Sequence, residues 1–396
     1  MSQLLAPLTQ AEIADLVSWR RSLHQEPELS LEERDTQAWL LHTLAALGAT
    51  DVRKVGGTGL ALHFGRGETD RTLLLRADMD ALPIAEQTGL PFASRRPGHM
   101  HACGHDGHMA SLLAVTRRLI AHGNEIAGHV VVAFQPGEEG GRGAVKMIEE
   151  GLLDGTWLDG VGPKVQAAYG LHLWSPLAVG VISCAAGPTM AAVDDFTVTV
   201  RGRGGHGALP HTADDAIVAA SHIVVALQSI ASRRTNPLEP VVVTVGSFHG
   251  GSAFNVIAEE VVLRGTVRSF GKALGENLPK WLEQIAHTTA AAHGTTATVD
   301  YKRYTVALHN DAAMAERIAY VAARTPGVTG VDRDLRMMAG EDMAYFLDAV
   351  PGCFFFVGCG GPQAEPHHSP RFLVDEAALP VGANVMLGAI GDFFSL

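Results

Sequence analysis

The sequence has little of several residue types, and each shortage excludes a class of protein. Only 4 of the 396 residues are cysteines, too few for a disulfide scaffold, so we expect a reducing, cytoplasmic environment. Lys and Arg total 30 against 42 Asp and Glu, and the net charge of −12 argues against nucleic acids and anionic membranes as partners. The sequence has no uninterrupted apolar run of about 18 residues, and its first residues lack the basic segment of a signal peptide. We therefore expect neither a membrane span nor a secretory leader.

What the sequence does contain is typical of a globular protein with two domains. Hydrophobic residues make up 47% and charged residues 18%, which is enough to form cores and excludes wholesale disorder. A chain of 396 residues exceeds the usual domain size of about 100–200 residues. Histidine is frequent, with 19 residues, and four of them lie between positions 98 and 108. This cluster is the first candidate for a functional site.

The first and last parts of the chain alternate between helical and strand patterns. Apolar spacing predicts helices at 10–25, 31–47, 109–121 and 144–151. Four short apolar runs are typical of buried strands: Thr72–Leu75, Val130–Phe134, Ala167–Leu171 and Cys353–Val357. Because these strands alternate with helices, we predict an α/β domain with a mainly parallel central sheet.

The middle of the chain has a different pattern. From Phe196 to Arg201, apolar and polar residues alternate, which predicts a strand with one face in water. The following pattern predicts a helix at 213–232, strands at 241–247 and 260–269, a helix at 278–293 and a strand at 296–301. The order βαββαβ is that of a ferredoxin-like domain. We place this domain at 190–303, inserted into a discontinuous α/β domain formed by 1–189 and 304–396.

A polar cluster follows each of the four predicted buried strands. In chain order, the clusters are Arg76-Ala-Asp78-Met-Asp80, Glu138-Glu139, His172 and His367-His368. Ligands of open α/β sheets bind at the carboxyl ends of the strands. We therefore expect these four clusters to converge on one site.

The segment from Met100 to His108 combines a thiol with several imidazoles. Cys103 and His105 are two residues apart at the start of a predicted helix, so both can reach one ion. A lone cysteine is more often a small core residue, but the nearby histidines and glycines favour metal ligation. Asp106 either orients a ligating histidine or is a helix-start acid that interacts with the helix dipole.

Two adjacent carboxylates, Glu138 and Glu139, follow a Pro-Gly turn. Because neighbours on a tight turn point in different directions, one can bind metal while the other takes a proton from a metal-activated water. The alternative is a solvated acidic turn, which the buried strand before it and the glycines around it make less favourable. One glutamate, one cysteine and three histidines form a ligand set that suits zinc or a neighbouring transition metal and can be shared by two ions.

The inserted domain contributes three polar candidates for substrate binding. His206 lies in the glycine-rich loop 202–207, Asn255 follows a glycine-containing turn, and Arg268 lies on a predicted strand. Each of them, taken alone, is typical of a turn or of a solvated strand.

Taken together, the motifs resemble those of the metal-dependent amidohydrolases of the aminoacylase and carboxypeptidase type. Within that family, they resemble the branch that contains hippurate hydrolase and the indole-acetyl-amino-acid hydrolases. The resemblance extends nearly end to end and rests on these ordered motifs: Arg21-Ser-Leu-His-Gln-Glu-Pro-Glu-Leu-Ser, Arg76-Ala-Asp-Met-Asp-Ala-Leu-Pro, Met100-His-Ala-Cys-Gly-His-Asp-Gly-His, Phe134-Gln-Pro-Gly-Glu-Glu-Gly-Gly, Gly170-Leu-His, Gly202-Arg-Gly-Gly-His-Gly, Ala253-Phe-Asn-Val-Ile, Gly340-Glu-Asp and His368-Ser-Pro.

The resemblance implies a zinc-peptidase-like catalytic domain with two divalent ions per subunit, which could be zinc, manganese, cobalt or nickel. The implied metal ligands are Cys103, His105, Glu139, His172 and His368. Glu138 is the implied general base, and His206 is expected to hold the substrate or polarise its carbonyl. We add Asp78 to the catalytic candidates, and Asn255 and Arg268 to the substrate-binding candidates.

Two positions depart from the wider family pattern. Relatives outside this branch have a metal-binding histidine where this chain has Arg76, and Cys103 compensates for it, as is usual in the branch. Met343 follows the Gly340-Glu-Asp motif where an aromatic residue is expected, a change that we expect to affect the substrate pocket and not the metals.

The implied reaction is hydrolysis of the amide bond of a small N-acyl amino acid, hippurate-like or N-acetylated, to a carboxylate and a free amino acid. One alternative is a dipeptidase or carboxypeptidase that uses the same metal site. Another is a metal-independent cysteine hydrolase with Cys103 as nucleophile. The resemblance further implies a homodimer or higher homo-oligomer formed through the inserted domain, with His206 serving its own site or that of the partner subunit.

Overall fold

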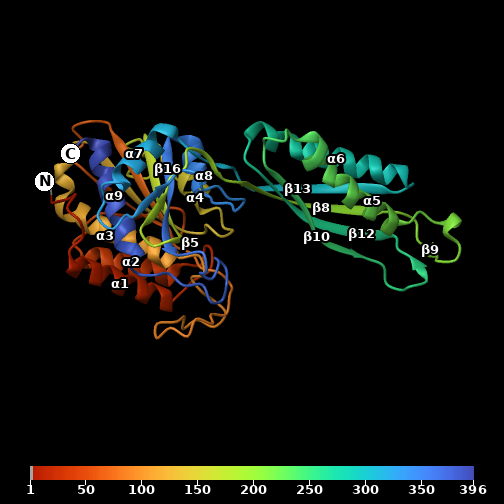
Figure 1. Cartoon of the computed structure of the whole chain (residues 1–396), viewed down its shortest axis with the longest axis horizontal. Coiled ribbons are helices and arrows are strands. Elements are labelled where there is room, and N and C mark those ends of the chain that lie inside the picture. Colours follow the sequence, from red (N-terminus) through yellow and green to blue (C-terminus); the bar gives the residue numbers. More distant parts are fainter. Residues whose placement is uncertain (1–2) are drawn as a thin grey trace. The chain divides into compact units, whose positions relative to one another are not determined.

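The computed structural model describes residues 3–396 and divides into two compact units (Figure 1). Unit 1 consists of residues 1–187, 309–336 and 342–396, of which the first two residues are not described. Unit 2 consists of residues 188–308 and 337–341. Two short paired strands, β7 (Gly187–Met190) and β14 (Leu308–Asn310), mark the passages of the chain between the units.

Unit 1 is built on an eight-stranded sheet with the order β1-β2-β4-β3-β5-β16-β6-β15. Its four central strands, β4, β3, β5 and β16, run parallel to one another. This confirms the predicted α/β class with a mainly parallel sheet. The strands are β1 (Val52–Lys54), β2 (Leu60–Phe64), β3 (Thr72–Asp78), β4 (His129–Gln135), β5 (Ala167–Ala178), β6 (Val181–Ser183), β15 (Gly330–Asp332) and β16 (Gly352–Gly360).

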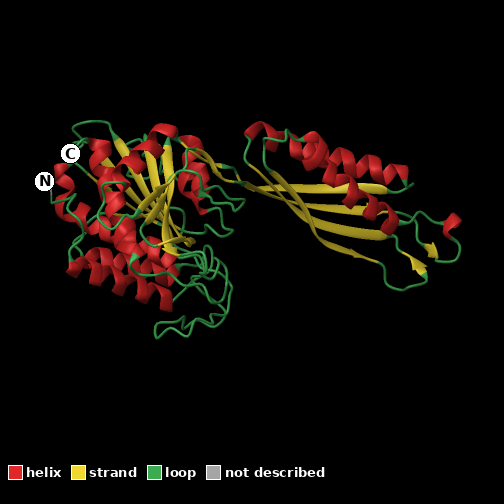
Figure 2. Ribbon diagram, in the orientation of Figure 1, coloured by secondary structure: helices red, strands yellow, loops and turns green. Residues whose placement is uncertain are grey.

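Helices cover both faces of this sheet (Figures 1 and 2). The helices of unit 1 are α1 (Gln10–Gln25), α2 (Arg34–Ala46), α3 (His105–His122), α4 (Gly143–Glu149), α7 (Ala312–Ala322), α8 (Met343–Ala349) and α9 (Ala378–Phe394). Successive side chains of a strand point to opposite faces. In β3, Leu73 and Leu75 therefore join the main core against α3, whereas Arg76 lies on the opposite face of the strand.

Unit 2 is a four-stranded antiparallel sheet with two helices packed on it. The strand order is β10-β12-β8-β13, and the chain follows βαββαβ, as expected for a ferredoxin-like fold. The strands β9 and β11 form a separate two-stranded sheet. The elements are β8 (Ala192–Arg201), β9 (Gly205–His206), α5 (Ala216–Ser229), β10 (Val241–Gly250), β11 (Val256–Ile257), β12 (Glu260–Ser269), α6 (Lys272–Ala292) and β13 (Thr296–Thr305).

Several element boundaries differ from those predicted. Strand β5 continues to Ala178, so His172 lies inside the strand and not after it. Helix α5 begins at Ala216, because the Asp215 side chain accepts hydrogen bonds from the first backbone amides of the helix. Helix α6 begins at Lys272, before Pro279, which lies inside the helix. These differences reflect packing and capping that the apolar spacing does not report.

One segment of unit 2, Ala216–Arg234, is long and apolar enough to cross a membrane by length and composition. In this fold one face of it packs on the sheet, where Ala219, Ile223 and Leu227 are buried in the core of unit 2. The opposite face remains exposed, with Val225 72% exposed.

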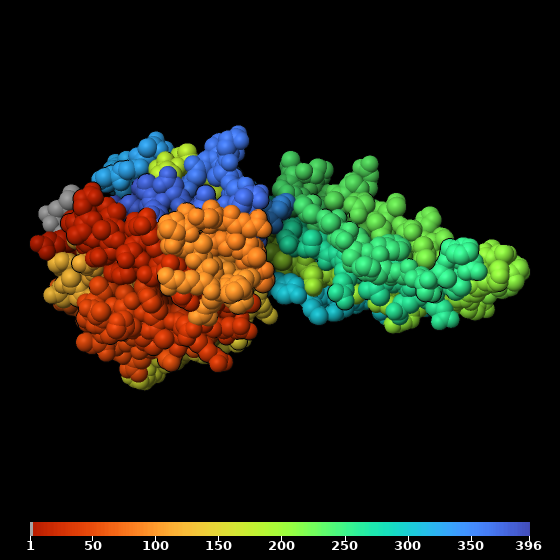
Figure 3. All heavy atoms as spheres, turned by 90° about the horizontal axis from the view of Figure 1, so that it is seen from below, coloured from red at the N-terminus to blue at the C-terminus, as the bar shows by residue number. Residues whose placement is uncertain are grey.

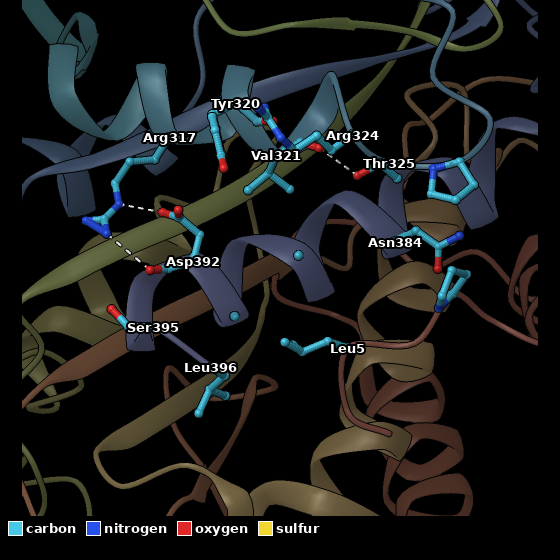
Figure 4. A pocket seen from close by; sticks show the side chains of 14 residues that line it. Leu5, Arg317, Tyr320, Val321, Arg324, Thr325, Asn384, Asp392, Ser395 and Leu396 are labelled. Atoms are coloured by element: carbon cyan, nitrogen blue, oxygen red, sulfur yellow. Dashed lines mark hydrogen bonds and ion pairs between the residues drawn. The ribbon is translucent and has the colours of Figure 1, made fainter. Parts of the chain in front are cut away.

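Unit 1 has a surface cavity whose lining residues come from segments other than the polar clusters. A cavity of about 630 Å³ is lined by the N-terminal segment, α7, α9 and the C-terminus, and Arg317 forms an ion pair with Asp392 at its wall (Figure 4). The cavity contains none of the predicted site residues. The segment after β3, coloured orange, covers part of the surface of unit 1 in Figure 3.

Candidate metal centre

The predicted ligands of unit 1 come from four different segments of the chain. His172 lies on β5, and Cys103 and His105 lie at the start of α3. Glu139 is on the turn after β4, and His368 is on the loop after β16. The structure brings them together: Cys103, His105 and His172 form one group, and Cys103, Glu139 and His368 form another, with the ligand atoms of each group within 4.8 Å of one another.

The start of α3 depends on a glycine. Gly104 separates Cys103 from His105 and has a φ of +90°, in the left-handed region that residues with a side chain rarely adopt. This turn lets the thiol and the imidazole, two residues apart, approach the same space. The Cys103 Sγ lies 3.5 Å from His172 Nε2.

Hydrogen bonds fix which nitrogen of each buried histidine can bind a metal. The Nδ1 of His105 lies 2.8 Å from the carbonyl oxygen of Asp80, and the Nδ1 of His172 lies 2.6 Å from that of Leu173. Because a carbonyl oxygen only accepts, both Nδ1 atoms carry the proton. In the neutral form of each ring, Nε2 therefore carries the lone pair and faces the ligand groups.

Two buried atoms of the site indicate that a cation fits here. The Nε2 of His105 and Oε1 of Glu139 have no hydrogen-bond partner, although both atoms are buried, and they lie 4.0 Å apart. Such polar atoms are rare in folded proteins unless an ion or water satisfies them. Burial works to lower the pKa of His105, but Asp78, Asp80 and Glu139 outweigh it and raise that pKa to about 10. The same negative surroundings favour a bound cation.

The candidate base, Glu138, is held by both its backbone and its side chain. Its backbone amide donates to Asp80 Oδ1 at 3.0 Å, and its Oε1 accepts a hydrogen bond from the backbone amide of Asp342 at 3.3 Å. A further group of close ligand atoms joins Glu138 with His105 and Glu139. The base therefore lies beside the candidate ligands and not on the outer surface of the turn.

Arg76, which departs from the wider family pattern, forms the centre of a buried network. Its guanidinium donates to Gln135 at 2.7 Å, to Asp78 at 2.8 Å and to Asp342 at 2.9 Å. Desolvation raises the pKa of Asp342 to about 6, although Arg76 and Gln135 oppose the shift. An arginine cannot ligate a metal in this protonated form, so it stabilises the two carboxylates instead.

Both carboxylate oxygens of Asp78, a catalytic candidate from the sequence, are hydrogen-bonded to neighbouring side chains. One carboxylate oxygen lies 2.6 Å from Nδ1 of His108, and the other accepts from Arg76. The Nε2 of His108 accepts the backbone amide of Leu173 at 2.8 Å. Asp78, His105 and His108 also come within 4.8 Å of one another, but both nitrogens of His108 are already engaged.

Two other sequence interpretations are resolved by the packing. Asp106 does not orient His105, because its carboxylate pairs with Arg20 at 2.7 Å and with Nδ1 of His24 at 2.8 Å. Met343 is fully buried, and its terminal carbon would lie 3.5 Å from a Cβ added at Gly170 on β5. It therefore fills space against the central sheet.

His367 belongs to the fourth polar cluster, but the sequence pattern predicts no role for it. Its Nε2 accepts the backbone amide of Ser175 at 3.1 Å, and its Nδ1 lies 3.9 Å from Cys103 Sγ. The ring stacks on Trp174 with 4.4 Å between centroids. Burial, with nearby histidines, lowers the pKa of His367 to about 3. Because His367 and His368 are adjacent in the sequence, the pattern alone could not distinguish a metal ligand from a residue that packs behind it.

The candidates of unit 2 lie in two separate places. His206 and Asn255 line a cavity of about 740 Å³ around β9 and β11. Arg268 is half-buried on β12, opposite Val193 of β8, and donates to the side chain of Thr266. The nine residues from Val193 to Arg201, after which the chain leads to β9, are separated by eight steps of strand and span about 27 Å. Within unit 2, Arg268 is therefore far from His206.

A profile of peptidase family M20/M25/M40 matches residues 74–392. The chain belongs to this family. It is 40% identical to N-acetyl-L-cysteine deacetylase of Bacillus subtilis over 92% of this chain and 84% of that protein. It is 38% identical to the IAA-amino acid hydrolase ILR1-like 4 of Arabidopsis thaliana, over 96% of this chain and 86% of the relative.

A solved structure of the same family also matches this chain. The YXEP protein of Bacillus subtilis, described as a dinuclear metal binding peptidase of the M20 family, superimposes with a TM-score of 0.84 at 32% identity. The match covers 98% of this chain and 99% of that chain. The family resemblance and the zinc-peptidase-like fold expected from the motifs are thus confirmed, and a pair of divalent ions fits the M20 family site.

Proposed function

We propose that this M20-family protein is a metal-dependent amidohydrolase that cleaves the amide bond of small N-acyl amino acids. The observation that carries the proposal is the convergence of two buried atoms without a hydrogen-bond partner, Nε2 of His105 and Oε1 of Glu139, on a thiol and two further histidines, next to a second glutamate. A site that only stores metal has no need of that glutamate.

Each residue has a distinct role in the proposed reaction. Cys103, His105, Glu139, His172 and His368 would hold two divalent ions, of zinc, manganese, cobalt or nickel. When bound, these ions supply Lewis acidity toward a water molecule and the acyl carbonyl. Glu138 removes a proton from the attacking water as its oxygen bonds to the acyl carbon. Glu138 then gives this proton to the amide nitrogen as the C–N bond breaks, which releases the carboxylate and the amino acid.

We assign Asp78 a positioning role in this scheme. Its two oxygens are engaged by His108 and Arg76, and His108 in turn accepts the amide of Leu173, next to His172. Asp78 thereby helps to hold β5 in place and does not exchange a proton with the substrate.

The experiment that tests the proposal is an assay of amine release from a panel of substrates, each with and without a chelator. N-acetyl, N-benzoyl and indole-acetyl amino acids sample the acyl group, and several dipeptides sample the peptidase alternative. We expect release from acylated amino acids that stops on chelation and returns with added Zn²⁺ or Mn²⁺. Release from dipeptides alone would move the assignment to a dipeptidase or carboxypeptidase. Activity that survives chelation but is lost on thiol alkylation would favour a cysteine hydrolase that uses Cys103.

For the substrate itself, we propose that unit 2 contributes from two copies of the chain. Arg268 carries a fixed positive charge suited to the carboxylate of the amino acid, and His206 with Asn255 can donate to the acyl carbonyl. About 27 Å of strand separates these groups, which is more than a small N-acyl amino acid spans. Both can serve one site only if they come from different copies of the chain, and we propose that His206 and Asn255 come from the partner subunit.

Such a homodimer is supported by the exposed apolar face of unit 2. This face consists of Ile217, Val218 and Val225 on α5, and the sheet on which α5 packs has β10 as an edge strand. Exposed apolar helix faces and unpaired strand edges are the surfaces through which identical chains associate.

A further inference from the structure

Two buried carboxylates accept hydrogen bonds from the backbone amides of the turn that carries Glu138 and Glu139. Asp80 accepts the backbone amide of Glu138 on one oxygen at 3.0 Å and that of Glu139 on the other at 2.9 Å. Glu33 accepts the amide of Gly137 at 2.8 Å. Three consecutive amides thus end on side-chain oxygens, where secondary structure would have supplied backbone carbonyls.

Asp80 also reaches the start of α3 through its backbone. Its carbonyl oxygen accepts a hydrogen bond from Nδ1 of His105. The Nε2 of that ring has no hydrogen-bond partner and faces the other candidate ligands. A single residue after β3 therefore touches the candidate base and two of the candidate ligands, which come from two other segments of the chain. Ser30 donates its hydroxyl to Asp80 Oδ2 and fixes the rotation of the carboxylate.

We infer that Asp80 is a positioning residue that sets the place of Glu138 relative to the ligands Glu139 and His105, with Glu33 as the second anchor of the turn. This inference rests on the proposed function. A carboxylate is required because both of its oxygens accept hydrogen bonds. An asparagine of the same shape offers one oxygen and turns an N–H₂ donor toward the second amide. That amide would lose its partner, and the turn would move.

The consequence for catalysis follows from how little displacement a general base tolerates. Residues behind a metal site typically change activity or metal affinity by about 10- to 100-fold when they are altered. Asp80→Asn is expected to lower kcat by about this factor with little change in KM, because Glu138 acts on the attacking water and not on substrate binding. The affinity for Zn²⁺ should fall as well, since Glu139 lies on the same turn.

The decisive experiment compares Asp80→Asn with Ser30→Ala, which removes a donor to the same carboxylate but leaves both amide bonds. Hydrogen–deuterium exchange of the peptide around 137–141, Zn²⁺ affinity in competition with a chromophoric chelator, and kcat with KM are measured for each. We expect faster exchange at this turn alone, weaker Zn²⁺ binding and a lower kcat in Asp80→Asn, and smaller changes in Ser30→Ala. Equal effects in the two variants, or wild-type behaviour of Asp80→Asn, would overturn the inference.

The inference stays testable if Asp80→Asn does not fold, and if the proposed function is wrong. In the wild-type protein the amides of Glu138 and Glu139 must exchange slowly, and rapid exchange there would contradict the role of Asp80 without any variant. The exchange and Zn²⁺ measurements need no substrate. A wild-type protein that hydrolyses no acylated amino acid would overturn the proposed function, while these two measurements would still decide the role of Asp80.

Discussion

At the scale of single residues, the site combines ionisable groups whose surroundings give them different tasks. His105 and His172 each use Nδ1 to donate to a backbone carbonyl, so their Nε2 atoms are available. Glu138 and Glu139 are adjacent in sequence, yet Glu138 Oε1 accepts the amide of Asp342 while Glu139 Oε1 lies 3.3 Å from Nε2 of His368. Two neighbouring carboxylates can therefore act as a base and a ligand.

Replacing Glu138 tests this division of tasks. Glu138→Gln keeps the shape of the side chain but removes its ability to take a proton, so we expect kcat to fall by at least about 100-fold. Metal content, measured by elemental analysis, should be nearly unchanged. Glu149→Gln, an exposed glutamate of the nearby helix α4, is the control and should leave both quantities as they are. Loss of metal in Glu138→Gln would mean that the base and the ligand are exchanged.

At the scale of elements, the site depends on contacts between strands β3 and β4 and the residues around α8. Arg76 on β3 joins Gln135 at the end of β4 to Asp342, which precedes α8. Asp342 also accepts a hydrogen bond from the backbone amide of Ala144, in the first turn of α4, at 3.1 Å. One buried guanidinium thus connects the sheet with both helices on this face.

This network predicts a large loss of stability on removal of its cation. Arg76→Met leaves the carboxylates of Asp78 and Asp342 buried without their partner, which costs about 3–5 kcal/mol of unfolding free energy. Chemical denaturation of the metal-free protein measures this value. Arg53→Met removes an arginine from exposed ion pairs and should change stability little. A loss below about 1 kcal/mol for Arg76→Met would show that the carboxylates are neutralised in another way, for example by proton uptake.

At the scale of the whole molecule, the proposed homodimer connects the surface of unit 2 with catalysis. Val225→Asp puts a charge on the apolar face of α5, where Val225 is 72% exposed, and should convert the dimer to monomers in analytical ultracentrifugation. Activity should fall with it, because His206 would no longer reach the partner's site. Val161→Asp, at a valine of unit 1 that is 88% exposed, is the matched control. A wild-type protein that is monomeric and active would contradict the proposal.

Mixing two inactive variants tests the shared site directly. Glu138→Gln and His206→Ala each lack one component, and a heterodimer restores both in one of its two sites. Recovery of activity on mixing is expected if His206 serves the partner subunit, and no recovery is expected if it serves its own.

The sequence by itself determined the four central strands of unit 1, the βαββαβ order of unit 2, the α/β class and the family. Each of these depends on local spacing: a strand such as Val130–Phe134 is apolar over its whole length because both of its faces are buried, and the motifs around Cys103 and Glu139 are contiguous. Boundaries set by capping, such as the start of α5 at Ala216, were less well predicted. The assignments of individual ligands, of Glu138, and of His206, Asn255 and Arg268 stay predictions for the experiments above.

Only the tertiary structure decided which groups support these residues. Arg76 and Asp342 are 266 residues apart in the chain, Asp80 and Glu139 are 59 apart, and Asp106 pairs with Arg20 from 86 residues away. Hydrogen bonds between such distant residues leave no periodic trace in the sequence, because each depends on how β3, β4 and α3 come together. For the same reason the chain order could not show that Asp80, and not Asp78, contacts the turn that carries Glu138.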